Sequence, residues 1–150
     1  MSFFIHPAAA SGMRRPTGLN RLRGAEKNKK SGGNQIMMQE WFRKAKLGIF
    51  IHYGIYAVGD VSESWSFHNG NISYEDYMKQ CEGFTASKYD PAAWAELFKK
   101  AGAQYVVMTA KHHDGVALFD TQYSDLSVVK KTPAGRDLIR EYMDAMSEAG

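Results

Sequence analysis

Two short apolar runs, separated by a helical pattern, most constrain what this chain can fold into. The first run covers residues 47–52 (LGIFIH) and the second covers residues 105–110 (YVVMTA). Both have the length of a strand and are almost continuously apolar. Such runs are typical of parallel strands that are covered on both faces. We therefore predict that the two runs are strands of one sheet.

A helical pattern follows each strand. After the first strand, Asp90 and Pro91 form a helix start, with aspartate as the N-cap and proline in the first turn, and Gly102 ends the helix. The apolar face of this helix recurs at helical spacing: Trp94, Leu97, Phe98 and Ala101. A second amphipathic helix runs to the end of the chain, with an apolar face of Leu138, Ile139, Tyr142, Met143 and Met146. Shorter helices are expected at residues 39–46 and after the N-cap Ser73.

The order strand, helix, strand, helix predicts an α/β fold with a parallel sheet. Two architectures satisfy this order. One is a small, open, doubly wound sheet, and the other is the first βα units of a (β/α)8 TIM-type barrel. Because a complete barrel needs about 250 residues, this 150-residue chain would hold an incomplete barrel.

The net charge of +3 is unevenly distributed along the chain. Residues 1–33 contain seven basic side chains and one acid, whereas the other 117 residues contain twelve basic and fifteen acidic side chains. We expect residues 1–36 to be a disordered basic tail and residues 37–150 to form the folded part. The folded part lacks a basic surface with interleaved aromatic residues, so we expect no nucleic-acid partner.

Composition excludes several further classes of protein. No run approaches the ~18 consecutive apolar residues of a membrane helix, so we expect no membrane partner. A single cysteine, Cys81, excludes an internal disulfide and a cysteine-based zinc site. The apolar run Phe3–Ile5 is too short for a secretory signal peptide, so the localisation stays unknown. The oligomeric state stays open as well.

Three histidines stand at the ends of the predicted strands. His52 ends the first strand, and His112 and His113 follow the second. Ligands bind beyond the carboxyl ends of parallel strands, so the three imidazoles mark a candidate site. Neighbours within a strand point to opposite faces, so His112 and His113 reach one pocket only if the strand has ended before them. Asp114 and Gly115 are turn residues that could end it. Alternatively, one histidine is a hydrogen-bonded core residue and the other lies on the surface.

Trp65 lies in the polar loop that follows the first strand, in the sequence Glu63-Ser64-Trp65. A tryptophan in such a loop can place its face against the C–H side of a sugar ring, with its N–H free to donate a hydrogen bond. The alternative is that Trp65 anchors the loop by packing against the domain.

Three segments together resemble the α-L-fucosidases of glycoside hydrolase family 29. The first segment is Trp41-Phe42 followed by residues 46–56 (KLGIFIHYGIY). The second lies within residues 84–95, as the short motifs FTA, YD and WA. The third and most specific is residues 101–115 (AGAQYVVMTAKHHDG). The segments occur in the order of the family, and the resemblance covers about residues 39–150.

The resemblance implies a barrel enzyme that removes terminal α-L-fucosyl residues from fucosylated glycans or glycosides with retention. We expect no cofactor and no metal. The substrate-binding residues that the resemblance implies or suggests are His52, Glu63, Trp65, His112 and His113. The three histidines would hydrogen-bond fucose hydroxyls. The family often carries an acid directly before the tryptophan, where this chain has Ser64, so Glu63 is one place away from the usual position.

The reacting carboxylates of the family, an aspartate nucleophile and an acid/base residue, belong to later strands. In retaining glycosidases they lie about 5–5.5 Å apart. Neither has a counterpart in these 150 residues, so we assign no catalytic residue and expect the chain alone to be inactive. Asp114 is not a replacement for them, because a role in forming the turn suits it better.

Two other functions are compatible with the sequence. One is a non-catalytic, carbohydrate-binding remnant of such an enzyme. The other is a metal-dependent hydrolase with His52, His112, His113 and Asp114 as ligands. Adjacent histidines rarely bind one metal, and the chain has no H-x-H or H-E-x-x-H spacing. These features disfavour the metal-dependent hydrolase.

Overall fold

The computed structural model describes residues 2–5 and 38–150. By its internal contacts the chain divides into two units, residues 8–44 and residues 1–7 together with 45–150. The first unit contributes one described helix, α1 (Glu40–Lys44), which lies within the helix expected at residues 39–46. An ion pair of 2.8 Å between Lys44 and Glu40, one turn apart, supports this helix.

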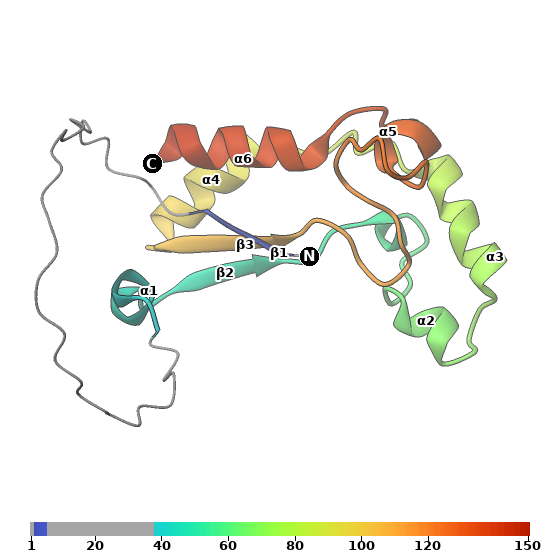
Figure 1. Ribbon diagram of the computed structural model, residues 1–150, viewed down its shortest axis with the longest axis horizontal. Coiled ribbons are helices and arrows are strands. Elements are labelled where there is room, and N and C mark those ends of the chain that lie inside the picture. The colour runs from blue at the N-terminus through green and yellow to red at the C-terminus, as the bar shows by residue number, and fades with distance from the viewer. Residues whose placement is uncertain (1, 6–37) are drawn as a thin grey trace, which may run out of the picture. The chain divides into compact units, whose positions relative to one another are not determined.

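The second unit is built on a three-stranded sheet with the order β1-β3-β2 (Figure 1). The strands are β1 (Ser2–Ile5), β2 (Gly48–Ile51) and β3 (Tyr105–Thr109). β2 and β3 correspond to the two apolar runs and pair in parallel, with Ile49 opposite Val106. The predicted pair of parallel strands is therefore confirmed.

The first strand differs from the expectation of a wholly disordered tail. β1 pairs antiparallel with β3, with Ser2 opposite Thr109 and Ile5 opposite Val106. The prediction is wrong for these four residues, while residues 6–36 of the predicted tail lie outside the described part of the chain. The sequence of β1 is apolar and aromatic, which favours a strand. The edge of β3 offers unpaired backbone groups that such a segment satisfies, so β3 does not keep a free edge.

Five short helices connect β2 to β3. They are η1 (Ile55–Ala57), α2 (Trp65–His68), α3 (Tyr74–Met78), η2 (Lys79–Gly83) and α4 (Pro91–Lys100), where η denotes a 3-10 helix. The predicted caps are confirmed. The hydroxyl of Ser73 accepts a hydrogen bond of 3.0 Å from the backbone N–H of Asp76, and the carboxylate of Asp90 accepts one of 3.0 Å from Ala93. Gly102 follows α4 in a left-handed conformation with φ of 78°.

Two helices follow β3, α5 (Val128–Lys131) and α6 (Leu138–Ala149). Asp137 caps α6 by accepting a hydrogen bond of 2.8 Å from the backbone N–H of Arg140. The predicted apolar face is confirmed except at Met143, which is 39% exposed. Across the described ranges, no helix combines the length and the apolar character that crossing a bilayer requires.

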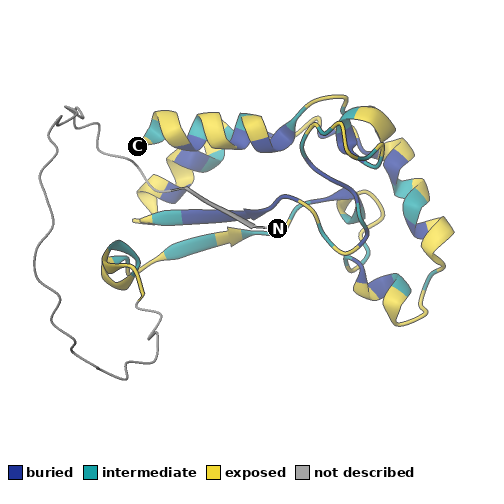
Figure 2. Ribbon diagram, viewed as in Figure 1, coloured by how far each residue is buried: buried dark blue, intermediate teal, exposed yellow. Residues whose placement is uncertain are grey.

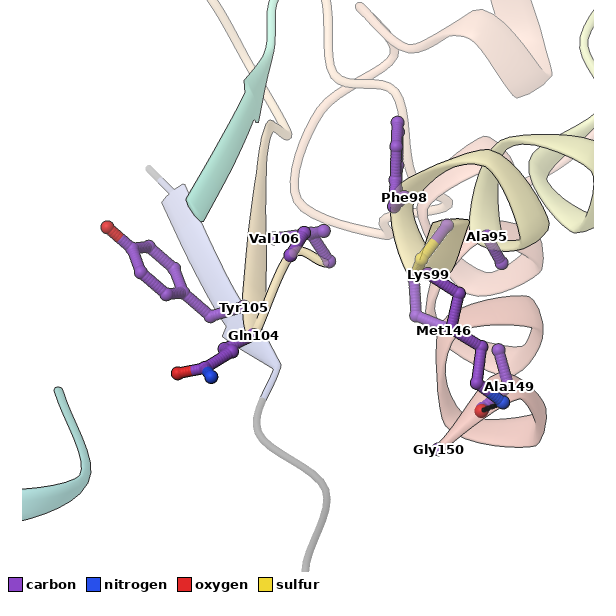
Figure 3. Close-up of a pocket in the computed structure, with 10 residues that line it drawn as sticks. Ala95, Phe98, Lys99, Gln104, Tyr105, Val106, Met146, Ala149 and Gly150 are labelled. Carbon is purple, nitrogen blue, oxygen red and sulfur yellow. Dashed lines mark hydrogen bonds between the residues drawn. The ribbon is translucent and has the colours of Figure 1, made fainter. Parts of the chain in front are cut away.

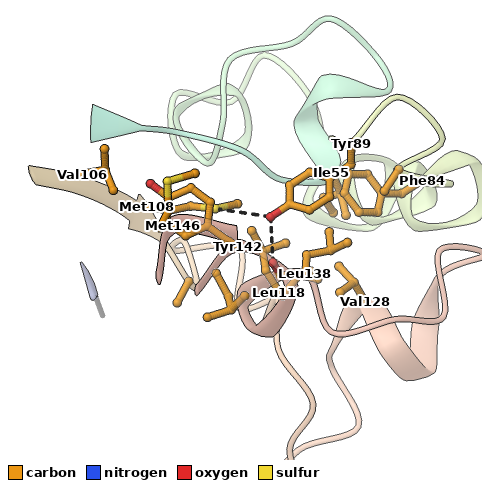
Figure 4. Close-up of a cluster of buried hydrophobic side chains, with 14 of the residues drawn as sticks. Ile55, Phe84, Tyr89, Val106, Met108, Leu118, Val128, Leu138, Tyr142 and Met146 are labelled. Atoms are coloured by element: carbon orange, nitrogen blue, oxygen red, sulfur yellow. Dashed lines mark hydrogen bonds between the residues drawn. The ribbon is translucent and has the colours of Figure 1, made fainter. Parts of the chain in front are cut away.

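The core lies between the sheet and the helices α4 and α6. Val106 and Met108 of β3 belong to the same buried cluster as Tyr142 of α6 (Figure 4). Phe98 of α4 belongs to this cluster as well, and Figure 2 colours most of β3 as buried. The hydroxyl of Tyr89 donates a hydrogen bond of 2.7 Å to the carbonyl of Leu138 (Figure 4). This bond ties the start of α6 to the segment before α4.

The two faces of the sheet differ in what covers them. α4 and α6 pack against each other and share a cluster with Val106 and Met108, so both helices cover the same face (Figure 1). By strand alternation, Val107 points to the other face. His52 directly follows β2, and its ring lies against that of Phe50 at a centroid distance of 4.7 Å, so both side chains lie on the same side of the sheet. Phe50 is 53% exposed, so this face of β2 remains open to solvent in the chain.

The core assignment can be tested with two leucines in different environments. Leu138→Ala should lower the free energy of unfolding by about 2–5 kcal/mol, because Leu138 is fully buried at the start of α6. Leu97 was predicted to lie on the apolar face of α4, but this prediction is wrong, because Leu97 is 60% exposed. Leu97→Ala should therefore alter the free energy of unfolding by less than about 0.5 kcal/mol. Urea unfolding followed by circular dichroism measures both values, and equal losses would contradict the core described above.

Candidate functional site

The parallel pairing brings the predicted histidines to one edge of the sheet. β2 ends at Ile51 and His52 follows it, while β3 ends at Thr109 and His112 lies three residues on. The ring centroids of His52 and His112 lie 5.6 Å apart, and those of His112 and His113 lie 5.1 Å apart. The three imidazoles predicted to meet at the carboxyl ends of the strands therefore lie together in the structure. Their individual roles stay predictions.

His112 is the most constrained of the three. Its Nδ1 lies 3.0 Å from the hydroxyl of Ser64, a serine that is only 4% exposed. The ring of Tyr56 packs edge-on against it at a centroid distance of 6.1 Å. Burial lowers the pKa of the His112 imidazole, although the carboxylates of Asp114 and Glu63 oppose this effect. His112 is therefore held in position, and its neutral form, in which one nitrogen donates and the other accepts, is favoured.

Glu63 lies beside two of these imidazoles. One ligand atom each from His52, Glu63 and His112 lie within 4.8 Å of one another. Glu63 is half-buried, whereas His52 is exposed. Glu63 stands one residue before the position at which the family often carries an acid, so its sequence position alone does not place its carboxylate at the site. In the structure the buried Ser64 binds His112 and the carboxylate of Glu63 lies next to the histidines.

Trp65 and His113 lie on a second part of the site. They line a cavity of about 290 Å³ together with Ser64, Phe67 and His68. Trp65 is 55% exposed, and its ring meets that of His68 edge-on at 5.2 Å. The alternative of a buried loop anchor does not suit a tryptophan with this exposure. The five predicted residues thus form two adjoining groups, joined by the contact between His112 and His113.

Asp114 takes no part in either group. It is 3% exposed, and one carboxylate oxygen accepts a hydrogen bond of 2.9 Å from the hydroxyl of Tyr77. The other oxygen accepts a hydrogen bond of 2.9 Å from the backbone N–H of Val116. Gly115, with φ of 91°, completes the turn in a conformation that side chains other than glycine rarely adopt. The predicted role of Asp114 in the turn after β3 is confirmed.

Three residues of the site were not among the predicted binding residues. Ser64 binds His112, Tyr56 packs against the same ring, and His68 lines the cavity beside Trp65. Burial raises the pKa of the Tyr56 hydroxyl to about 12, so the phenol stays protonated at neutral pH. His68 could have been found from the sequence, because it follows Trp65 by three positions and residues three apart on a helix lie on the same face. The sequence marked Ser64 only as the residue that stands where the family often carries an acid, and gave no sign of its contact with His112.

A smaller hollow lies near the other end of β3, between α4 and α6 (Figure 3). Its volume is about 60 Å³, room for about two water molecules. The lining is formed mainly by helix and strand residues such as Phe98, Val106 and Met146. It is therefore a packing gap rather than a binding site for a sugar.

Comparison with known proteins agrees with the resemblance described above. The family model for alpha-L-fucosidase matches residues 20–150, beginning upstream of residue 39, where that resemblance starts. The chain belongs to the alpha-L-fucosidase family. The tissue alpha-L-fucosidase of Rattus norvegicus is 34% identical to it, over 69% of this chain and 26% of that protein. The chain spans about a quarter of the length of the curated relatives that it matches.

Solved structures of fucosidases share this architecture. Alpha-L-fucosidase isoenzyme 1 from Paenibacillus thiaminolyticus is 48% identical, with a TM-score of 0.69 over 74% of this chain and 26% of that chain. The alpha-fucosidase of Thermotoga maritima in complex with fucose is 41% identical, with a TM-score of 0.60 over 73% of this chain and 32% of that chain. The fold of the chain therefore matches a part of a fucosidase catalytic domain.

The environment of His112 predicts how its titration differs from that of an ordinary histidine. Its pKa should lie below the usual value of about 6.5, because partial burial penalises the charged ring. Since the unfolded chain binds this proton more readily, the contribution of His112 to stability is present above pH ~6.5 and is lost as the pH falls through the folded pKa. NMR titration of the imidazole protons measures the midpoint directly. A midpoint above the usual value would contradict the burial of this ring.

Proposed function

We propose that this chain forms the first βα units of a (β/α)8 barrel and supplies one wall of its fucose-binding site. In the complete barrel the next strand takes the edge of β3 that β1 occupies in this chain. In a barrel the helices cover the outside of the sheet and side chains fill the inside. The placement of α4 and α6 on one face, with Phe50 and His52 on the open face, supports this assignment. A doubly wound sheet carries helices on both faces, so this arrangement does not favour the open-sheet alternative.

We further propose that the parent protein hydrolyses terminal α-L-fucosyl residues by a retaining double displacement. The observation that carries this proposal is the convergence of His52, Glu63 and His112 at the carboxyl edge of the parallel strands. Imidazole nitrogens can donate to or accept from sugar hydroxyls, and a carboxylate accepts from two hydroxyls at once. A relative crystallised with fucose supports the choice of sugar.

Trp65 and His113 would bind the same sugar from the adjoining cavity. An exposed indole face offers an apolar surface to the C–H side of a pyranose, and its N–H remains free to donate. The contact between the rings of His112 and His113 makes the two groups continuous. The proposed ligand is therefore a fucosyl unit held by polar groups on one side and by the tryptophan on the other.

The chain by itself should not hydrolyse a fucoside. The resemblance to the family assigns neither the nucleophile nor the acid/base carboxylate to any of these 150 residues, and retaining hydrolysis requires both. An aryl fucoside incubated with the purified chain measures this. The control is the same purification from cells that carry an empty vector. Turnover above that control would mean that a carboxylate of this chain reacts.

The histidines should affect catalysis rather than folding in a complete fucosidase that contains this sequence. Removing one imidazole leaves a buried sugar hydroxyl without a partner, which costs roughly 1–3 kcal/mol. At about 1.4 kcal/mol per tenfold change, His52→Ala and His113→Ala should each lower kcat/KM roughly tenfold to a few hundredfold.

The measurement needs a surface control and a stability readout on the same proteins. Lys100→Ala, an exposed change on α4, should leave kcat/KM unaltered. Melting temperatures distinguish sugar-binding histidines from purely structural ones. Loss of a purely structural histidine would lower the melting temperature and leave kcat/KM near normal. Normal kcat/KM in folded His52 and His113 variants would refute the sugar-binding roles. A folded complete protein that binds fucose without turnover would instead indicate a carbohydrate-binding remnant.

A further inference from the structure

The cluster of His52, Glu63 and His112 also has the composition of a metal site. Two imidazoles and one carboxylate are a donor set that zinc enzymes use, with a fourth position left open. Imidazole ligands suit Zn²⁺, Cu²⁺ and Ni²⁺. We propose that these three residues bind a divalent transition-metal ion such as Zn²⁺, and that this ion and the sugar exclude each other from the site.

The distances allow a site that closes around the ion. The three ligand atoms lie within 4.8 Å of one another. In a tetrahedral zinc site with bonds of about 2.0–2.1 Å, ligand atoms are about 3.3 Å apart, so the cluster must contract by up to about 1.5 Å. His52 is exposed and Glu63 is half-buried, so side-chain rotation can supply this movement. A site that forms only on binding should exchange its metal readily.

Ser64 orients His112, one of the proposed ligands, before the ion binds. Its hydroxyl lies 3.0 Å from Nδ1 of His112, so Nε2 is the nitrogen left for a metal. Histidine ligands in metal sites commonly bind a polar group through their second nitrogen, which fixes the orientation of the ring. Ser64 is 4% exposed, so solvent does not compete strongly for this contact. Ser64 is a positioning residue in this proposal and does not itself bind the ion.

The neighbouring histidine and aspartate are excluded from the ligand set. The ring of His113 stands at 82° to that of His112 and lines the cavity beside Trp65. Both carboxylate oxygens of Asp114 are held, by Tyr77 and by the backbone of Val116. The ligand set weighed from the sequence, which contained His113 and Asp114, is therefore replaced by one that contains Glu63. In this proposal the bound ion competes with the sugar and does not catalyse hydrolysis.

Metal binding can be measured on the chain of 150 residues itself. After dialysis against EDTA and then against metal-free buffer, titration with Zn²⁺ in a calorimeter should show one ion per chain. Co²⁺ should give the visible absorption of a tetrahedral complex. Glu63→Gln and His112→Gln should each weaken binding at least tenfold. Ser64→Ala should weaken it about tenfold or more, since loss of such a supporting contact commonly costs 10–100-fold.

Two other histidines provide matched controls. His113→Ala, one residue from a proposed ligand, and His68→Ala, in the adjoining cavity, should change the affinity by less than about twofold. Circular dichroism establishes whether each variant folds. Where a variant fails to fold, the imidazole nitrogen signals of the unaltered chain decide, because Zn²⁺ should shift those of His52 and His112 and leave His113 in place. Absence of one-to-one binding, or equal losses in the control variants, would overturn the metal site.

Competition with L-fucose separates this inference from the proposed function on which the exclusion rests. Excess L-fucose should raise the apparent dissociation constant for Zn²⁺ in the unaltered chain. If Zn²⁺ binds through the three residues and fucose has no effect, the metal site stands, while the exclusion and the sugar-binding role of this cluster fail. If fucose binds and Zn²⁺ does not, the metal site fails and the sugar-binding role stands.

Discussion

The parallel pairing of β2 with β3 is the interaction on which the site depends. Strands that run in the same direction end at the same edge of a sheet, so His52 and His112 meet there although they are sixty residues apart. The register is constrained at the other end, where a Cβ on Gly48 would overlap the ring of Tyr105. Because side chains alternate along a strand, a shift of β2 by one residue relative to β3 would turn Phe50 towards the helices. The position of the imidazoles therefore follows from the pairing of β2 with β3, which begins at Gly48 and Tyr105, at the opposite end of the strands.

A second constraint acts on the turn after β3 and decides where the adjacent histidines point. The buried carboxylate of Asp114 accepts hydrogen bonds from Tyr77 and from the backbone of Val116, and Tyr74 donates to its carbonyl at 3.1 Å. These contacts join the turn to α3. The turn therefore fixes the two rings at 82° to each other, with His112 against Ser64 and His113 in the cavity. Asp114, which lies in neither group of the site, thus determines where His112 and His113 point.

The elements that local patterns specify could be predicted from the sequence. The strands β2 and β3 and the caps at Ser73, Asp90 and Gly102 are set by residues within one turn or one strand of where they act. The features missed depend on distant partners. The pairing of β1 needs the edge of β3, and the contact between Ser64 and His112 spans forty-eight positions. Met143 lies on the apolar stripe of α6 by its spacing, yet it is 39% exposed because the cluster does not extend to cover it.

The site is rigid on one side and adaptable on the other, which bears on what it can bind. His112 is held through Nδ1 and by partial burial, so its free nitrogen offers nearly the same geometry to any ligand. His52, directly after β2, is exposed, and the carboxylate of Glu63 extends from a half-buried loop position. A sugar can meet each side chain through a separate hydroxyl, so the side-chain atoms need not approach one another, whereas a metal ion draws its ligands to about 3.3 Å from one another. Discrimination between the two must therefore come from how far His52 and Glu63 can move, and a segment that packs against the open face would favour the sugar by restricting that movement.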